Sequence, residues 1–430
     1  MPNIYFFQKK LIFYVEMEAY NSHFKIIKYF ASILGLWPSQ SKFMKYSMTT
    51  FAWLLLMSLL IAQLLAIRNV YESLDLLIIW MPPFIVNIFV ICYLTTACVK
   101  RNKLELIFSK MKENYLHYES ELEFEILEEY GLLTKNINKV AVILFYTFST
   151  EYIFFTLVPC FLDLIRPLNE SRPRTFILIA EYFVNPNVFN NYLAIWIHQM
   201  LMTTLLTTVI LTIDGIFEVF IFHACGQFEI LGLKIKNMVK FDYNQSNSFE
   251  KNVKKEIRFF VQKHQSVIMF VLKSNNVKCK FFKIIIFSII FLRLVNDISD
   301  VFSFIYFIGL GFNMIVISFT GVQIIMNLGN TTETTKILSY NFILIFRLFC
   351  LTLPCQCLID QSTLLFENIY ECYWYNLSPQ SNKLLGILML MCMKPVTFTA
   401  GKLYTFSMNS FSNVVRTSVS YFMVLLSLRE

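Results

Sequence analysis

The last apolar stretch of the sequence carries a row of polar residues that could line a path for ions. With a rotation of 100° per residue in an α-helix, the row and one valine fall within an arc of about 80°. The row consists of Asn409, Asn413, Arg416, Ser420 and Ser427, with Val424 at the edge of the arc. A charged and amide-bearing stripe cannot face lipid. It either packs on the rest of the chain, or several copies turn it inward around a water-filled channel that Val424 constricts.

Residue patterns typical of enzymes are missing from the sequence. The five histidines form no His-Glu-x-x-His motif, and there is no glycine-rich phosphate loop. His223 and Cys225 lie two positions apart but have no third ligand nearby, whereas a zinc site needs three or four. His198 lies in an apolar stretch, where helix packing and ligand contact both remain open. We therefore expect no catalytic residues, no metal and no cofactor.

The elements that hold the polar stripe must lie in a membrane. Of the 430 residues, 56% are hydrophobic and only 15% are charged, whereas about a quarter of a soluble domain is charged. This composition excludes a soluble enzyme, a disordered protein and a secreted disulfide scaffold. The net charge of +8 does not indicate nucleic acid binding, because Lys and Arg collect in polar stretches between apolar runs. We expect an all-α polytopic membrane protein.

Seven apolar stretches are long enough to cross a membrane, at about 20 residues for each helix. They cover residues 46–67, 76–99, 139–163, 182–213, 301–332, 337–359 and 384–428. The seventh contains Pro395 and Gly401, which remove a helix hydrogen bond and loosen the backbone. We expect a short helix up to about Lys394, a break over 395–402 and a second helix over 404–428.

Lys and Arg in the loops predict the side on which each loop lies. One set of alternate loops is 1–47, 100–139, 223–300 and 361–383; the other is 68–75, 163–192, 327–337 and 426–430. The first set holds 27 of the 37 Lys and Arg, and the second holds 6. Cytoplasmic loops carry the excess, so we expect a cytoplasmic N-terminus and an extracellular C-terminus. Asn169 and Asn330 then lie in outside loops, as candidates for glycosylation.

The long cytoplasmic loops have helical patterns of their own. Residues 103–130 and 226–272 mix charged and apolar positions, which predicts a cytoplasmic layer of helices. Residues 274–293 fit their surroundings poorly, because their apolar run is too short to span a membrane. We interpret this segment as an insertion, with an interfacial cytoplasmic helix as the alternative. Residues 1–16 are interpreted as an extended start.

The C-terminal region resembles that of the insect odorant receptors. The residues that carry this resemblance are Lys394, Pro395, Ala400, Gly401, Lys402, Tyr404, Ser407, Phe411, Arg416, Ser418 and the run 420–425, with Trp37-Pro38 and His264-Gln265 upstream. Two alternatives stay open. Gustatory receptors typically end in Thr-Tyr, five residues and Gln-Phe, whereas Ser420-Tyr421 is followed here by Ser427-Leu428. A metabotropic seven-helix receptor would have the opposite orientation and an Asp/Glu-Arg-Tyr triplet after span three. A membrane enzyme or transporter is disfavoured, because no half of the chain repeats.

The resemblance implies a subunit of a ligand-gated, nonselective cation channel in the plasma membrane of a sensory neuron dendrite. Ser427 stands where the shared co-receptor has glutamine, which implies a ligand-tuning subunit in a hetero-tetramer with that co-receptor. Val424 corresponds to the hydrophobic gate, and 362–394 to the cytoplasmic anchor. The implied organisation is a cytoplasmic segment over 1–45, a six-helix ligand-binding bundle over 46–361, the anchor and first half of span seven over 362–403, and the pore helix with a short tail over 404–430.

The resemblance also implies a pocket for a small volatile ligand in the outer half of the bundle, between spans two, three, four and six. Aromatic and apolar walls with few hydroxyl groups suit a ligand that is held by burial and shape. The candidate ligand-binding residues are Trp80, Phe84, Ser149, Tyr152, Ile153, Thr156, Trp196 and Met200. Ordinary packing is the alternative for each of them.

Overall fold

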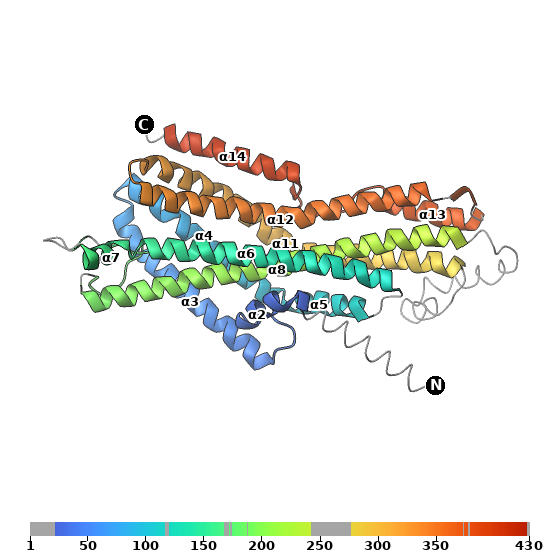
Figure 1. The fold of residues 1–430 in the computed structure, drawn as a ribbon, viewed down its shortest axis with the longest axis horizontal. Helices are drawn as coiled ribbons and strands as arrows, with labels where there is room; N and C mark the ends of the chain where they lie inside the picture. The colour runs from blue at the N-terminus through green and yellow to red at the C-terminus, as the bar shows by residue number, and fades with distance from the viewer. Residues whose placement is uncertain are drawn as a thin grey trace.

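Long helices that run roughly along one axis make up almost all of the structure, a computed structural model (Figure 1). It describes residues 22–116, 120–166, 172, 174–186, 188–241, 277–372, 374–376 and 379–427. Of the sequence features discussed above, residues 1–16, Asn169 and His264 lie outside the described residues. The result agrees with the all-α architecture that the composition predicts.

The helices follow one another with short connections. In chain order they are α2 (Lys25–Ile33), α3 (Lys42–Val70), α4 (Leu74–Val99), α5 (Arg101–Leu116), α6 (Glu121–Phe155), α7 (Val158–Ile165), α8 (Phe189–Phe241), α11 (Val277–Met326), α12 (Thr331–Glu371), the 3-10 helix η2 (Trp374–Asn376), α13 (Pro379–Cys392) and α14 (Met408–Ser427). Between α13 and α14, β1 (Thr399–Ala400) pairs with β2 (Tyr404–Thr405) in an antiparallel hairpin.

Five of the described helices, α3, α4, α8, α11 and α12, are long and apolar enough to cross a membrane. The helices α6 and α14, with 35 and 20 residues, have sufficient length but more polar sequences. A crossing count of seven therefore stays a prediction. The outer face of α3 exposes large apolar side chains such as Phe51, Leu54 and Ile61. Such a face is stable against lipid and costly in water.

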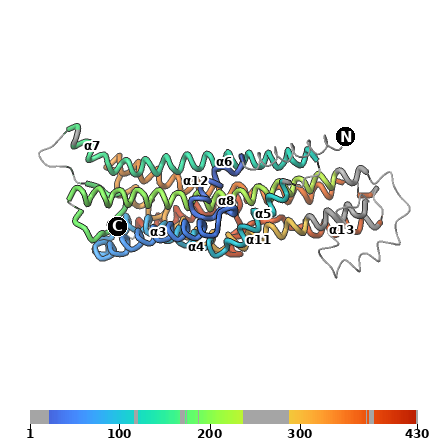
Figure 2. Tube along the Cα trace, turned by 90° about the horizontal axis from the view of Figure 1, so that it is seen from below, coloured from blue at the N-terminus to red at the C-terminus, as the bar shows by residue number. Residues whose placement is uncertain are grey.

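The helix α8 forms the centre of the bundle. In its most apolar window 89% of the residues are buried, against 33–56% in the other four helices. Figure 2 shows α8 between α6 on one side and α4 and α11 on the other. A helix that is apolar all round belongs in the interior, and α8 can therefore hold polar groups away from both lipid and water.

The ends of the helices fall into two groups (Figure 1). The turn between α3 and α4, the short helix α7, the turn between α11 and α12 and the C-terminal end of α14 lie at one end of the bundle. At the other end lie α5, α13 and the last turns of α8 and α12. This grouping matches the two sets of alternate loops in the sequence. Which end faces the cytoplasm stays a prediction.

Three helices have boundaries that differ from those expected from the sequence. The fourth apolar stretch becomes helical only at Phe189, and α8 continues well beyond its expected end at residue 213. Residues 277–293 form the first turns of α11, where Phe291 is buried in the core, instead of a separate interfacial helix. That this segment is an insertion stays a prediction. The last helix begins at Met408 instead of 404, because Tyr404 and Thr405 pair with β1.

Candidate functional site

A cavity of about 180 Å³ lies between α4, α6, α8, α11 and α12. Four of these helices correspond to the expected spans two, three, four and six, and α11 is an additional wall. The lining is mainly apolar and aromatic. It includes Val86, Phe89, Phe145, Phe148, Phe312 and Leu344. A volume below the roughly 300–1,000 Å³ of drug-sized pockets fits a small ligand.

Two of the eight residues expected to bind ligand, Ser149 and Tyr152, line this cavity. The other six, Trp80, Phe84, Ile153, Thr156, Trp196 and Met200, do not. Trp80 lies instead toward α3, where its indole nitrogen donates a hydrogen bond to the Gln63 carbonyl at 3.2 Å. Its ring stacks on Phe84 with centroids 4.2 Å apart. The two aromatic residues therefore join α4 to α3.

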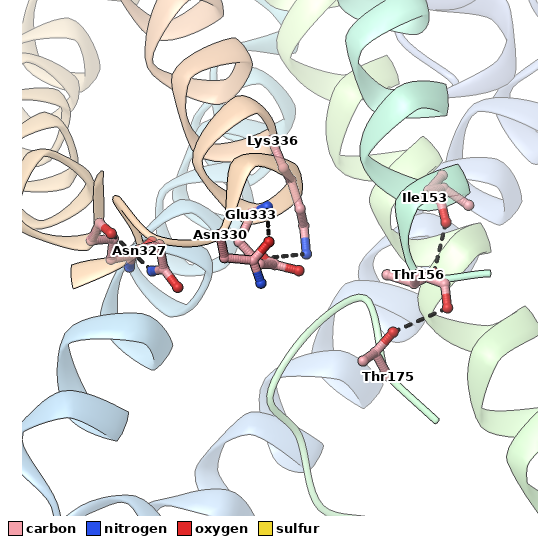
Figure 3. Close-up of polar contacts among 8 residues, drawn as sticks. Ile153, Thr156, Thr175, Asn327, Asn330, Glu333 and Lys336 are labelled. Atoms are coloured by element: carbon pink, nitrogen blue, oxygen red, sulfur yellow. Dashed lines mark hydrogen bonds and ion pairs between the residues drawn. The ribbon is translucent and has the colours of Figure 1, made fainter. Parts of the chain in front are cut away.

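Thr156 and Trp196 form a bonded unit at the end of the bundle. The indole nitrogen of Trp196 donates to the Thr156 hydroxyl at 2.9 Å. The Thr175 hydroxyl donates to the Thr156 carbonyl at 3.0 Å, which ties the segment before α8 to the end of α6 (Figure 3). Ile153 and Met200 pack against the main core. Ligand contact by any of the eight residues stays a prediction.

Sequence reasoning missed five charged or amide side chains that line the cavity: Glu151, Asn313, Gln323, Lys336 and Arg347. The signal for two of them was present, since Glu151 and Arg347 interrupt otherwise apolar stretches. Ionisable residues inside a membrane span are expensive and commonly functional. Asn313 and Gln323 carried no such signal because they are uncharged, and Lys336 lies between two apolar stretches.

Glu151 and Lys336 lie near the end of α12 that begins at Thr331. The Ser339 hydroxyl donates to the Glu151 carboxylate at 3.2 Å. The Lys336 ammonium lies 4.5 Å from the centroid of the Tyr152 ring and 3.5 Å from the Glu333 carboxylate (Figure 3). One cation and one carboxylate, Lys336 and Glu151, therefore line this end of the cavity, and Glu333 pairs with Lys336 beside it.

Arg347 closes the opposite end of the cavity. Its guanidinium lies 5.1 Å from the centroid of the Phe89 ring and forms an ion pair with Asp214 of α8. The hydroxyls of Tyr93 and Tyr306 both donate to the same Asp214 oxygen. The cluster formed by Asp214, Arg347, Tyr93 and Tyr306 joins α4, α8, α11 and α12, and we name it the polar cluster. Buried charges are tolerated when they are paired and hydrogen-bonded in this way.

Aromatic rings connect the polar cluster to the start of α14. The Tyr306 ring packs edge-on against Phe398 and Phe406, with centroids 6.1 and 5.9 Å away. These two phenylalanines flank the hairpin and are buried. The Ser303 hydroxyl of α11 donates to the Thr399 carbonyl at 2.6 Å, and the Gly401 amide donates to the Ser303 carbonyl at 3.0 Å. The hairpin is therefore fixed to α11 directly beside Tyr306.

The helix α14 lies along the outside of the bundle against α11 and α12 (Figure 1). Its inner face buries Val414 and Ser418, and the Ser318 hydroxyl donates to the Ser418 carbonyl at 3.0 Å. The polar stripe faces the other way. All six of its residues are exposed: Asn409, Asn413, Arg416, Ser420, Val424 and Ser427. The stripe therefore does not pack on the other helices of its own chain.

Asn330, one of the two glycosylation candidates, is exposed in the turn before α12. Its side-chain oxygen accepts a hydrogen bond from the Glu333 amide at 3.3 Å and so caps the helix (Figure 3). A glycan would be attached to the side-chain nitrogen of Asn330, and this cap does not use that nitrogen. Among the described residues, no group of three or more His, Cys, Asp or Glu side chains is placed to hold a metal ion.

Comparison with known proteins finds relatives of this chain by sequence. A sequence model of the 7tm Odorant receptor family matches residues 73–419. The chain is 25% identical over 281 residues to Odorant receptor 13a of Drosophila melanogaster, which covers 60% of this chain and 58% of that protein. It is 26% identical over 137 residues to the odorant receptor coreceptor of Ooceraea biroi, which covers 32% of this chain and 29% of that protein. The chain thus matches less than two thirds of the length of these curated relatives.

The fold has a solved counterpart. The insect olfactory receptor OR5 from Machilis hrabei, solved in complex with eugenol, superposes with a TM-score of 0.77 at 13% identity. The match covers 96% of this chain and 99% of that receptor. A second structure of the same receptor gives a TM-score of 0.72. The prediction of a polytopic helical membrane fold is therefore confirmed.

Proposed function

Because the chain belongs to the 7tm Odorant receptor family, we propose that it is the odorant-tuning subunit of a ligand-gated, nonselective cation channel. It assembles with an odorant co-receptor subunit as a hetero-tetramer. Small volatile molecules gate the channel in the plasma membrane of a sensory neuron dendrite. Family membership favours this function over a gustatory receptor, which the sequence left open.

The exposed polar stripe of α14 is the observation that carries this proposal. An arginine and two asparagines on the outside of an apolar bundle are costly in lipid. The cost disappears when equivalent helices from several subunits surround a water-filled path. Val424 is the apolar member of the stripe, close to the C-terminal end of α14. We assign it as the constriction that opens when it moves away from the axis.

The cavity is the proposed ligand site. A ligand that fills it touches Arg347 of the polar cluster and Phe89, whose ring lies 5.1 Å from the Arg347 guanidinium. From there the contacts continue through Tyr306 to Phe406 and the first turn of α14. A ligand shifts such an equilibrium only by its difference in affinity for the closed and open arrangements. In the proposed mechanism the ligand fits the cavity better when α14 has moved outward.

The other parts of the chain have roles that follow from this assignment. The α13 helix packs beside the end of α12, which supports an anchor over 362–394 where subunits meet. The six-helix bundle over 46–361 holds the ligand site, and 404–430 supplies the pore. The similarity to odorant receptor coreceptors supports assembly with such a subunit.

Whole-cell current from cells that express this chain with an insect co-receptor tests the proposal. We expect a volatile panel to evoke a current with little preference between Na⁺ and K⁺, and cells with the co-receptor alone to lack those responses. A tag at the C-terminus should be accessible to antibody on intact cells. A tag that is reached only after permeabilisation contradicts the orientation and favours a metabotropic receptor.

A further inference from the structure

Asn313 on α11 differs from the other buried amides around the cavity. Its side chain is 7% exposed and lines the cavity, and it has no hydrogen-bond partner among the described residues. By contrast, Gln323 donates to the Ile78 carbonyl at 2.7 Å. Asn341 donates to a backbone carbonyl and accepts from the Thr320 hydroxyl at 2.9 Å. A buried amide without a partner is costly, so Asn313 is a site that a ligand group can satisfy.

Four of the hydroxyl groups that line the cavity are already occupied. Ser149 and Thr207 bond to each other across α6 and α8 at 3.0 Å. Thr203 donates to the Gln199 carbonyl at 2.9 Å, and Thr320 donates to Asn341. These groups offer a ligand little beyond contact area. The amide of Asn313, which can both donate and accept, is therefore a specific polar feature of this apolar wall.

The position of Asn313 within the cavity limits the charge of that ligand group. Asn313 lies one helical turn from Gly309, which packs on the Phe89 ring at the Arg347 end. Asp214 already neutralises Arg347 there. Lys336 and Glu151 lie toward the opposite end, and the 11 residues from Lys336 to Arg347 span about 16 Å of α12. A ligand charge at this end of the cavity would meet an ion pair that is already neutral and hydroxyl groups that are already bonded, which is unfavourable.

We propose that Asn313 hydrogen-bonds a single uncharged oxygen atom on a mostly apolar ligand, and that the chain thereby selects oxygen-bearing volatiles over hydrocarbons of the same shape. Carbonyl and hydroxyl oxygens share this chemistry. The apolar remainder of the ligand packs on the aromatic side chains of α6 and α11. This assignment rests on the proposed function, since it takes the cavity as the ligand site.

Binding to the purified full-length chain tests the assignment with probes that differ only at the oxygen. Acetophenone and α-methylstyrene have the same shape, as do 2-heptanone and 2-methyl-1-heptene, because CH₂ replaces the carbonyl oxygen. Dissociation constants come from titrations that follow the thermal unfolding midpoint in lipid nanodiscs. We expect each ketone to bind about tenfold more tightly than its alkene, the effect of about one hydrogen bond.

Asn313→Leu keeps the size of the side chain and removes its hydrogen bonding. We expect the ketone to lose about tenfold in affinity and the alkene to keep its affinity, so that the preference disappears. Thr212→Val is the control, because it removes a buried hydroxyl of α8 that bonds the Thr208 carbonyl of its own helix and does not line the cavity, and it should leave the ratio of ketone to alkene affinity unchanged. If Asn313→Leu does not fold, Asn313→Val provides the same comparison.

Three results would overturn the assignment: equal affinities in the wild-type chain, a preference that survives in Asn313→Leu, or no binding of either ketone. The readout is binding and not current. A chain that shows the preference but carries no odorant-evoked current with a co-receptor would reject the proposed channel function and leave this assignment intact.

Discussion

The Arg347 guanidinium donates to both carboxylate oxygens of Asp214, from Nε at 2.6 Å and from Nη2 at 3.1 Å. The pair joins α12 to α8 inside the bundle, and each side chain is about one tenth exposed. Two parallel hydrogen bonds to a carboxylate fix the geometry as well as the charge. One face of this pair touches the cavity and the other touches the tyrosines that lead to α14.

Removing one partner of this pair should destabilise the chain more than removing both. Arg347→Met leaves the Asp214 carboxylate buried without a cation, and Asp214→Asn leaves the guanidinium without an anion. Loss of one partner from a buried pair costs about 3–5 kcal/mol. We expect both single variants to have lower unfolding midpoints in nanodiscs and less protein at the cell surface, and the double variant to recover much of the loss.

Lys103 and Asp300 provide the control for that cycle. They form an ion pair at 2.8 Å, but both side chains are largely exposed. Exposed ion pairs contribute little to stability, so Lys103→Met should unfold close to the wild-type midpoint. Losses from the two single variants at Asp214 and Arg347 that simply add in the double variant would contradict the coupling of that pair.

Val424→Asn should raise the current in the absence of odorant. An amide at an apolar constriction lets water remain in the pore, which removes the barrier that keeps it dry. The matched control is Val419→Asn on the same helix. Val419 is 53% exposed and Val424 is 54% exposed, but the two lie about 140° apart around the helix. Whole-cell basal current, normalised to surface protein, should rise several-fold for Val424→Asn alone. An unchanged basal current would count against Val424 as the gate.

Gly401→Ala should disturb the hairpin that precedes α14. Gly401 has a φ of 58°, and a Cβ atom there would lie 2.7 Å from the Phe307 ring. A left-handed backbone costs a residue with a side chain about 1–2 kcal/mol, and the contact with Phe307 adds to that cost. We expect a lower unfolding midpoint and a weaker odorant response at equal surface protein.

Gly386 of α13 is the control for Gly401, because a Cβ there meets nothing within 4 Å. Alanine is a better helix former than glycine, by up to about 1 kcal/mol. Gly386→Ala should therefore leave the midpoint unchanged or raise it slightly. Equal effects of the two substitutions would show that the backbone at Gly401 is not the cause.

Two substitutions separate the glycan of Asn330 from its helix cap. Asn330→Gln removes both, and the lost cap alone should cost about 1 kcal/mol. Thr332→Ala destroys the Asn-x-Thr triplet but keeps the Asn330 oxygen on the Glu333 amide. We expect both variants to lose a glycosidase-sensitive band shift and only Asn330→Gln to unfold earlier. A wild-type chain with no such shift would contradict glycosylation at this position.

The sequence predicts the long helices well because each of them coincides with a continuous run of apolar residues. The end of α8 illustrates where this reasoning stops. The charge-free stretch ends before Asp214, so the sequence predicts the boundary of the span there. In the structure the helix continues, because Arg347 neutralises Asp214 from α12. A partner 133 positions away in the chain is not visible in a local pattern.

The polar stripe could be predicted because it depends on the rotation of a single helix. The cavity depends on which faces of five helices meet. Rotating one helix by a single residue position changes which side chains line the cavity. Tyr152 lines the cavity and the adjacent Ile153 does not. The hairpin likewise depends on Ser303, almost a hundred positions before the strand that it holds. The geometry of the hairpin could not be predicted from the helix break at Pro395 and Gly401 alone.

The exposure of the α14 stripe has a consequence for how such chains diverge. The six stripe side chains contribute almost nothing to the packing of their own chain, and exposed positions tolerate substitution with little change in stability. Heritable changes there can alter what the assembled subunits do together while each chain still folds. Changes at Val414 or Ser418, which are buried against the bundle, are restricted by folding itself. Neighbouring positions of one short helix are therefore under different selective pressures.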